Sequence, residues 1–340
     1  MVRIVTLSQK EEWNRLVGQC VFHDFYHTAS YHALATDGTP CLFVYGDAKR
    51  YIAFPLLLRP IAGTSYYDIT SVYGYCGPLF SQSEVDEEMC SAFSDALFRW
   101  MVAQRVVAAF TRLHPFLPLQ QSLLSRLGNV VPIGETVWID LSGQFRNGYS
   151  RSLRYQLNVA ERHMCVRESC LPDDWTVFET IYGEAMNRLH AAPRYCFSSD
   201  YFAALRGSSD FVPKLYLADD RKQRVIGGAI CILCKGVAQY HLGACCTDAL
   251  SFSPLKLILD YACSDLQHKR QADCLHLGGG YGGAADTLFQ FKSRFSPLRK
   301  QFYVWQCIVD QPVYEALVAE RVGENIDRMS QNFFPLYRLY

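Results

Sequence analysis

The residues best suited to chemistry lie in one stretch of the chain, which reads LHLGGGYGGAADTLFQFKSRF from Leu275 to Phe295. It sets five glycines ahead of Lys292, which follows Phe291 directly. Glycine lets a backbone approach a substrate closely, and a lysine held among apolar neighbours serves as a fixed cation. The stretch therefore predicts a site for a polar or anionic group. A glycine-rich β-to-α turn followed by an ordinary surface lysine is an equally good interpretation.

A basic cluster occupies the segment from Ser150 to His163, which predicts a helix. Its arginines follow one another at spacings of three and eight residues, so they share roughly one helical face. Guanidinium groups bind phosphate or carboxylate through paired N–H donors, so the cluster predicts an anion-binding surface. A solvated basic face paired with nearby glutamates stays open as the alternative. The three members are Arg151, Arg154 and Arg162.

Two tyrosines stand out among the aromatic residues. Tyr73 and Tyr195 each lie beside glycine, proline or arginine in a predicted loop. Exposed aromatic rings can stack on a nucleobase, so both are candidate substrate-binding residues. Aromatic residues make up 14% of the chain, and core packing is the expected use for most of them.

The elements that must position these residues follow an α+β order. In the second half, predicted helices come first, then three strands from Lys214 to Leu242 in an antiparallel meander, and then a strand, a helix and a last strand. The first half has a similar rhythm, ending near Gly143. Such an order argues against a doubly wound parallel sheet. The sequence predicts mixed, mostly antiparallel sheets in two tandem domains.

Composition sets further limits. With 340 residues the chain has room for about two domains, and its 33 basic and 33 acidic side chains give no overall attraction to nucleic acid or anionic membrane. Neither a signal peptide nor a transmembrane segment is predicted, so a soluble cytoplasmic protein is the expectation. The fourteen cysteines fall mostly in apolar segments, which favours reduced, structural thiols. No metal site is predicted, because the Cys231-x-x-Cys234 pair lies in a predicted strand without a second pair.

Six motifs stand out along the chain, namely YGYCGPL, RSLRYQLNVAERH, YHLGA, SPLKLILDYA, LHLGGG and FQFKSRFS. These motifs resemble the GNAT superfamily of acyltransferases, and their tandem arrangement resembles its FemAB-like branch. The resemblance implies two GNAT-like domains, at residues 1–145 and 146–310, and a C-terminal tail at 311–340. It also implies that Lys292 stabilises charge on the donor phosphate or the acyl carbonyl, and that neighbouring motif residues bind substrate. These residues are Tyr240, His276, Gly279, Gly280 and Phe291.

The sequence departs from this family pattern where a general base is expected. Many FemAB-like members carry an aspartate close after the Gly-Pro of the first domain, but here Gly77-Pro78 is followed by Leu, Phe and Ser. The remaining candidates are Asp68 and Asp286, with His241 or His276 on adjacent predicted strands. Each could instead be a cap, a turn residue or a satisfied core group. An amine can also lose its proton to water or to the leaving group, so a dedicated base is not compulsory.

A second departure concerns the donor. GNAT enzymes that use acetyl-CoA have a glycine-containing turn that holds the pyrophosphate at a helix N-terminus, whereas this chain offers TDALSFSPLKL, with no glycine in the turn. The prediction is therefore an acyltransferase without a bound cofactor that uses aminoacyl-tRNA as its donor, and acyl-CoA is the alternative. The acceptor is an amine, either a cell-wall precursor or another peptide, small-molecule or natural-product amine. A non-catalytic binding protein of the same fold is the further alternative.

Overall fold

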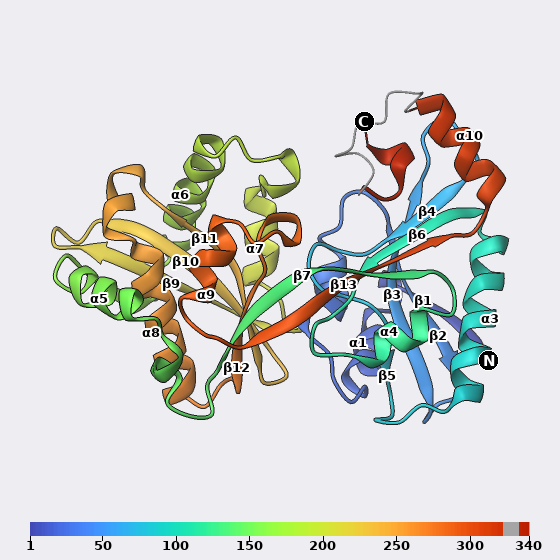
Figure 1. The fold of residues 1–340 in the computed structure, drawn as a ribbon, viewed down its shortest axis with the longest axis horizontal. Coiled ribbons are helices and arrows are strands. Elements are labelled where there is room, and N and C mark those ends of the chain that lie inside the picture. Colours follow the sequence, from blue (N-terminus) through green and yellow to red (C-terminus); the bar gives the residue numbers. More distant parts are fainter. Residues whose placement is uncertain (322–332, 340) are drawn as a thin grey trace. The chain divides into compact units, whose positions relative to one another are not determined.

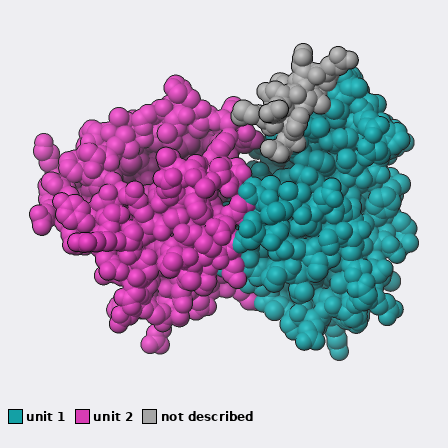
Figure 2. Space-filling view, viewed as in Figure 1, with its two compact units in different colours: residues 1–133, 301–340 teal, residues 134–300 magenta. Residues whose placement is uncertain are grey.

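The computed structural model describes residues 1–321 and 333–339, and it divides into two compact units (Figure 2). Unit 1 comprises residues 1–133 and 301–340, and unit 2 comprises residues 134–300. The chain therefore leaves unit 1 inside strand β7 (Asn129–Asp140) and returns to it inside strand β13 (Arg299–Ile308). Each unit combines a sheet with several helices (Figure 1).

The sheet of unit 1 has the strand order β1-β2-β3-β4-β6-β13, with β5 paired to β3. Only β4 and β6 run parallel among these pairs. The remaining strands are β1 (Val2–Thr6), β2 (Thr39–Gly46), β3 (Tyr51–Pro60), β4 (Tyr67–Thr70), β5 (Leu79–Phe80) and β6 (Val106–Arg112). The helices are α1 (Lys10–Gly18), α2 (Ala29–His32), α3 (Glu87–Ala103), α4 (Leu119–Leu124) and α10 (Gln311–Arg321).

Helices cover both faces of this sheet, as the alternation along β2 shows. Phe43 packs in a core cluster with Phe93 of α3, while its neighbour Leu42 packs in a different cluster with Trp13 of α1. Successive side chains of a strand point to opposite faces, so a strand covered on both sides is apolar throughout. Helix α3 begins where the Asp86 side chain accepts a hydrogen bond from the Met89 N–H at 2.8 Å.

The sheet of unit 2 has the order β7-β12-β11-β10-β9-β8. Strands β9, β10 and β11 form the predicted antiparallel meander, and only β11 and β12 run parallel among the pairs of this sheet. The strands besides β7 are β8 (Met164–Glu168), β9 (Val212–Asp220), β10 (Val225–Cys234), β11 (Val237–Cys245) and β12 (Cys274–Gly278). The helices are α5 (Arg151–Ala160), α6 (Asp174–Arg188), α7 (Ser199–Arg206), α8 (Pro254–His268) and α9 (Thr287–Ser293).

The two faces of this second sheet carry different helices. Leu153 of α5 and Ile258 of α8 share one core cluster with Leu275 of β12. On the other face, Phe178 of α6 packs so close to Gly228 of β10 that a Cβ at that glycine would lie 2.6 Å from the ring. The glycine-rich loop of this unit joins β12 to α9.

The observed domain boundaries correct the predicted ones at 145/146 and 310/311. The first boundary falls inside a strand, because β7 continues from one unit into the other without a turn. The predicted tail at 311–340 is also wrong for its described part, since Tyr314, Leu317 and Tyr337 are buried in a core cluster of unit 1. Residues 322–332 and 340 of that tail lie outside the described residues.

Three smaller features of the structure can be compared with the sequence. Helix α5 ends at Ala160, so Arg162 lies in the following turn and does not extend the helical face of Arg151 and Arg154. No disulfide joins any two of the fourteen cysteines, all of which lie within the described residues. Within residues 1–321 and 333–339, no helix is long and apolar enough to cross a membrane.

Candidate active site

Lys292 is a buried cation in the last turn of α9. Its side chain is 8% exposed, and its Nζ donates a hydrogen bond to the Gly279 carbonyl at 2.7 Å. Nζ also lies 6.0 Å from the centroid of the Tyr240 ring. Burial lowers the pKa of Lys292 to about 8, because desolvation disfavours the charged form, and the nearby Asp286 carboxylate opposes this shift. The predicted pairing of a glycine loop with a fixed lysine is thus a real contact.

The loop between β12 and α9 uses its glycines for distinct reasons. Gly278, Gly282 and Gly283 have positive φ values of 77°, 59° and 84°, which side chains with a Cβ rarely adopt. A Cβ at Gly279 would lie 2.9 Å from the Glu135 carbonyl oxygen, and one at Gly280 would clash with the Ala284 carbonyl and the Asp286 carboxylate. The loop therefore holds one specific conformation and presents its backbone at close range.

Lys292 lies where two parallel strands part. Strands β11 and β12 pair only from Val237 to Gln239 and from Cys274 to His276. Beyond those residues each continues along its other neighbour, β10 or β7. Tyr240, whose ring faces Lys292 Nζ, is the first residue of β11 past the shared ladder. A fork between strands next to a buried cation offers main-chain groups and a charge to the same ligand.

Asp286 caps the helix that carries the lysine. Its carboxylate accepts hydrogen bonds from the N–H groups of Phe289 at 2.8 Å and Tyr281 at 2.9 Å. Burial acts to raise the pKa of Asp286, but these backbone hydrogen bonds outweigh it and lower the pKa on balance. A carboxylate with a lowered pKa is a weak proton acceptor near neutral pH, so the geometry supports the cap interpretation over the base.

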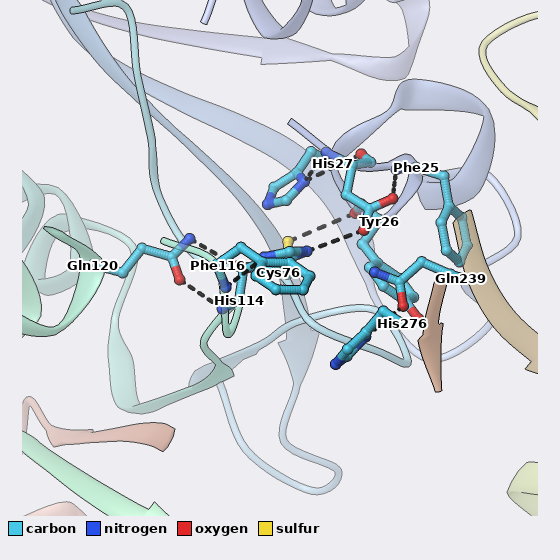
Figure 3. A network of polar contacts seen from close by, with 10 residues as sticks. Phe25, Tyr26, His27, Cys76, His114, Phe116, Gln120, Gln239 and His276 are labelled. Carbon is cyan, nitrogen blue, oxygen red and sulfur yellow. Dashed lines mark hydrogen bonds and ion pairs between the residues drawn. The ribbon is translucent and has the colours of Figure 1, made fainter. Parts of the chain in front are cut away.

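The side chains of His276 and His241 both contact polar side chains of unit 2. His276 is fully buried, with Nδ1 at 2.7 Å from Oε1 of Gln239 (Figure 3). Because an amide oxygen only accepts, Nδ1 carries the proton. His241 Nε2 lies 2.6 Å from the Tyr201 hydroxyl, and burial lowers the pKa of His241 to about 3. A histidine with that pKa is neutral and weakly basic at physiological pH, which disfavours it as a base.

The basic helix α5 is tied to the end of α9. The Ser150 N–H donates to the Arg294 carbonyl at 2.8 Å, and Ser150 caps α5 by accepting from the Leu153 N–H at 3.2 Å. Arg151 and Arg154 are exposed, and the Arg154 guanidinium contacts only main-chain carbonyls, those of residues 146 and 147, among the described residues. Two predicted anion-binding arginines thus lie on the helix that begins beside the lysine-bearing helix.

A further pair of cations flanks this region. Lys256, in the first turn of α8, donates to the Ser253 hydroxyl at 3.1 Å. Burial, and then repulsion from Arg294, lower the pKa of Lys256. Neither residue was among the sequence candidates, because the two belong to helices far apart in the chain and only the fold brings their charges near each other.

The remaining candidates of unit 2 are aromatic. Tyr195 ends a short 3₁₀ turn, Pro193–Tyr195, and its ring centroid lies 6.1 Å from that of Tyr281 in the glycine loop. Phe291 is partly buried, with its ring 5.5 Å from that of Phe295, so it supports the core below α9. Sequence reasoning missed Tyr281 although it stands inside the glycine run itself.

Asp68 and Tyr73 belong to unit 1. The Asp68 carboxylate is fully buried and accepts hydrogen bonds from Arg59 Nε and Arg338 Nε, both at 2.8 Å. Both oxygens are therefore ion-paired, which suits a structural carboxylate better than a base. Tyr73 is 44% exposed, and its carbonyl accepts from the Tyr31 hydroxyl at 2.9 Å.

Unit 1 also contains a buried polar network that the sequence did not indicate (Figure 3). His114 Nε2 lies 3.0 Å from Asp24 Oδ2, and both side chains are fully buried. Gln120 Nε2 donates to the carbonyls of Cys76 and Pro78 at 2.9 and 3.0 Å. The network fixes the loop around Gly77, where a Cβ would strike the Gln120 amide.

Comparison with known proteins decides the fold. No protein-family model matches the sequence, and no curated protein matches it. Among solved structures, FemX superposes with a TM-score of 0.69 over 93% of this chain and 99% of its own, at 13% identity. The chain has the tandem GNAT fold of FemX. A tandem GNAT protein from the clavulanic acid biosynthesis pathway shares it with a TM-score of 0.52, over 91% of this chain and 99% of its own, at 10% identity.

A third solved structure extends this comparison. The L-PGS from Bacillus licheniformis superposes with a TM-score of 0.59 over 93% of this chain and 97% of its own, at 12% identity. The predicted FemAB-like, tandem GNAT architecture is therefore confirmed at the level of the fold. In this tandem GNAT chain, Lys292 lies in unit 2.

Proposed function

We propose that this tandem GNAT protein is an acyltransferase that passes an aminoacyl group from aminoacyl-tRNA to an amine, forming an amide. The observation that carries the proposal is Lys292, a buried cation that donates to the glycine loop at the fork of two strands. Burying a lysine costs free energy, and no carboxylate pairs with this one among the described residues. A site that retains such a charge suits an anionic ligand or a developing oxyanion.

The chemistry needs little more than this cation. The amine nitrogen attacks the ester carbonyl carbon, and a tetrahedral intermediate with an oxyanion forms. Its collapse keeps the new C–N bond, breaks the C–O bond to the ribose, and releases the ribose hydroxyl with the proton that the amine gives up. An ammonium group has three N–H donors, and Gly279 accepts one of them. The other two can be directed at the oxyanion.

Lys292 can also take part in moving the proton. With its pKa lowered to about 8, the group is mostly protonated at neutral pH and yet gives up a proton more readily than an ordinary lysine. It can therefore donate its proton to the departing ribose oxygen and regain a proton from the attacking amine nitrogen, so that the net transfer is from amine to ribose oxygen. This role fits a site in which Asp286 is a cap and His241 has a pKa of about 3.

Two features favour aminoacyl-tRNA over acyl-CoA as the donor. The turn before α8 is a 3₁₀ helix without glycine, Thr247–Phe252, so few backbone N–H groups can approach a pyrophosphate closely. In contrast, α5 offers exposed arginines and begins beside the end of α9, the helix that carries Lys292, which suits the phosphates of an RNA. Acyl-CoA remains the alternative donor. The acceptor is proposed as an amine of a cell-wall precursor, another peptide or a small molecule.

The test is a donor-loss assay with purified protein. Aminoacylated bulk tRNA and a panel of acyl-CoAs are offered in parallel with an amine mixture, and the amount of intact donor is followed. We expect loss from charged tRNA with the wild type and with Lys222→Ala, which removes an exposed lysine of the same unit. Loss only from acyl-CoA would replace the proposed donor, and loss from neither would favour the non-catalytic alternative.

A further inference from the structure

Tyr281 is a large side chain fixed in an exposed position on the glycine loop. Its side chain is 59% exposed, whereas its backbone N–H donates to Asp286 Oδ2 at 2.9 Å. Gly280 before it has no room for a Cβ, and Gly282 after it has a φ of 59°. The backbone on both sides is therefore constrained, so the ring is presented to solvent from a defined position. The exposed ring is therefore not part of the core of its unit.

A second segment brings another ring and a cation to the same place. The Tyr195 ring centroid lies 6.1 Å from that of Tyr281, and the Arg194 guanidinium carbon lies 5.7 Å above the Tyr195 ring. The Tyr182 hydroxyl holds this turn by donating to the Tyr195 carbonyl at 2.8 Å. Arg194 is exposed and has no ion pair with a described residue. The three groups form an ordered set of two aromatic rings and one cation.

This set lies beside the reactive group that we propose. Tyr281 follows Gly279 by two residues, and the Gly279 carbonyl accepts the hydrogen bond from Lys292. A ligand that contacts the Tyr281 ring is therefore held within a few residues of the cation. Other rings nearby are used differently, since Phe197 stacks on Tyr201 with centroids 4.1 Å apart and Tyr201 bonds to His241. Phe197, Tyr201 and His241 therefore already contact one another.

We propose that Tyr281, supported by Tyr195 and Arg194, is a stacking platform for the adenine ring of the acyl donor. A purine has an extended π-face that stacks on tyrosine, and a guanidinium strengthens such a stack and can pair with an adjacent phosphate. This inference rests on the proposed function, and it names the part of the donor that the enzyme recognises.

The position of the platform favours one source of adenine. In aminoacyl-tRNA the adenine and the reactive ester are carried on the same terminal ribose, so a base bound to Tyr281 places its ester near Lys292. In acyl-CoA the adenine is separated from the thioester by the whole pantetheine arm. A platform only two residues from the lysine-bound glycine therefore fits the terminal adenosine of tRNA.

The test uses an RNA hairpin that ends in CC followed by 2-aminopurine riboside, a fluorescent isomer of adenosine. Stacking on an aromatic ring quenches this base. We expect quenching on titration with the wild type and with Tyr281→Phe, which keeps the ring. Tyr281→Ala should bind about tenfold more weakly or worse, without quenching. Tyr67→Ala, which removes a partly exposed tyrosine of unit 1, is the matched control and should behave as the wild type.

Equal affinity and equal quenching for Tyr281→Ala and the wild type would overturn the platform. Displacement of the probe by unlabelled RNA ending in CCA more readily than by CoA would identify tRNA as the source of the adenine, and the reverse order would identify CoA. The transfer assay is run alongside. Wild-type transfer with an unchanged KM in Tyr281→Ala would reject the platform alone, whereas quenching that depends on Tyr281 without any transfer would support the platform and reject the proposed reaction.

Discussion

Lys292 holds its charge at a cost that the protein could avoid with an apolar residue. The side chain is 8% exposed, and its hydrogen bond to Gly279 replaces only part of its hydration. Burial lowers its pKa to about 8, from the value near 10.4 that is usual for lysine. A residue that reduces stability at neutral pH and yet is held by a hydrogen bond to a tightly built loop is expected to serve function rather than folding.

This cost predicts how stability depends on pH. Between about pH 8 and 10.5 the unfolded state binds more protons at this lysine than the folded state, so its contribution to stability becomes more favourable as pH rises. The free energy of unfolding of the wild type, measured relative to Lys292→Met, should increase by up to about 3 kcal/mol across that interval. Urea unfolding at several pH values measures this difference. A difference that stays constant with pH would mean that Lys292 titrates normally.

Single residues could be predicted from sequence only where the local pattern was sufficient. The pairing of Lys292 with a glycine loop and the alternative of Asp286 as a cap were both visible, because these residues lie within twenty positions of one another. The approach of Tyr195 to Tyr281 was not visible, since the two are joined by the fold and not by spacing. The same limit applies to the double ion pair at Asp68, because its partner Arg338 lies 270 residues away in the sequence.

At the scale of elements, the glycine loop and the helix after it act as one piece. Gly280 leaves space for the Asp286 carboxylate, which in turn caps α9 and so places Lys292. Gly183 is different, because it lies inside α6 with no atom within 4 Å of where a Cβ would be. Substituting alanine at each glycine therefore compares a position where a Cβ clashes, Gly280, with one where it does not, Gly183.

Gly280→Ala should force the loop to move and should lower both transfer activity and the free energy of unfolding, the latter by about 1–3 kcal/mol. Gly183→Ala should leave activity unchanged and raise the free energy of unfolding by about 0.5–1 kcal/mol, since alanine favours a helix interior. Denaturant titrations and initial rates of the two variants check this. Full activity in Gly280→Ala would show that the loop conformation is not required.

The strands and helices with strong periodicity were predicted well. The meander of β9, β10 and β11 lies where the pattern placed it, and β12, α9 and β13 come after it in the predicted order of strand, helix and strand. Strand β4, Tyr67–Thr70, gives no clear sequence signal, because its four residues are too few to show alternation. Helix α5 was predicted three residues too long at its C-terminal end. The turn after Ala160 continues the basic pattern, but the N–H groups of Arg162 and His163 donate to carbonyls three residues back instead of four.

At the scale of the whole molecule, the C-terminal segment completes unit 1. Arg338 Nε donates to the buried Asp68 carboxylate, and Arg338 Nη2 donates to the Pro60 carbonyl at 2.7 Å. No local pattern indicates that residues near 338 return to strands β3 and β4. The boundary inside β7 was hidden for a similar reason, because a strand that continues between units carries no turn signal.

Arg338→Ala should therefore destabilise unit 1, because it leaves Asp68 with only one of its two guanidinium partners in a fully buried position. We expect a loss of about 2 kcal/mol in the free energy of unfolding. Arg126→Ala, which breaks an exposed ion pair with Glu87, should change it by less than about 0.5 kcal/mol. Thermal unfolding of both variants tests this. Equal stabilities would show that the C-terminal segment contributes little to unit 1.

The most direct measurement of the central claim is the single-turnover rate of amide formation from aminoacyl-tRNA and an accepted amine. It compares the wild type, Lys292→Met and Lys222→Ala under the same conditions. Methionine keeps most of the buried volume and removes the charge, so we expect the rate of Lys292→Met to fall by about 100-fold or more, while Lys222→Ala keeps the wild-type rate. A Lys292→Met protein that forms the amide as fast as the wild type would contradict the proposed role of this lysine in the transfer.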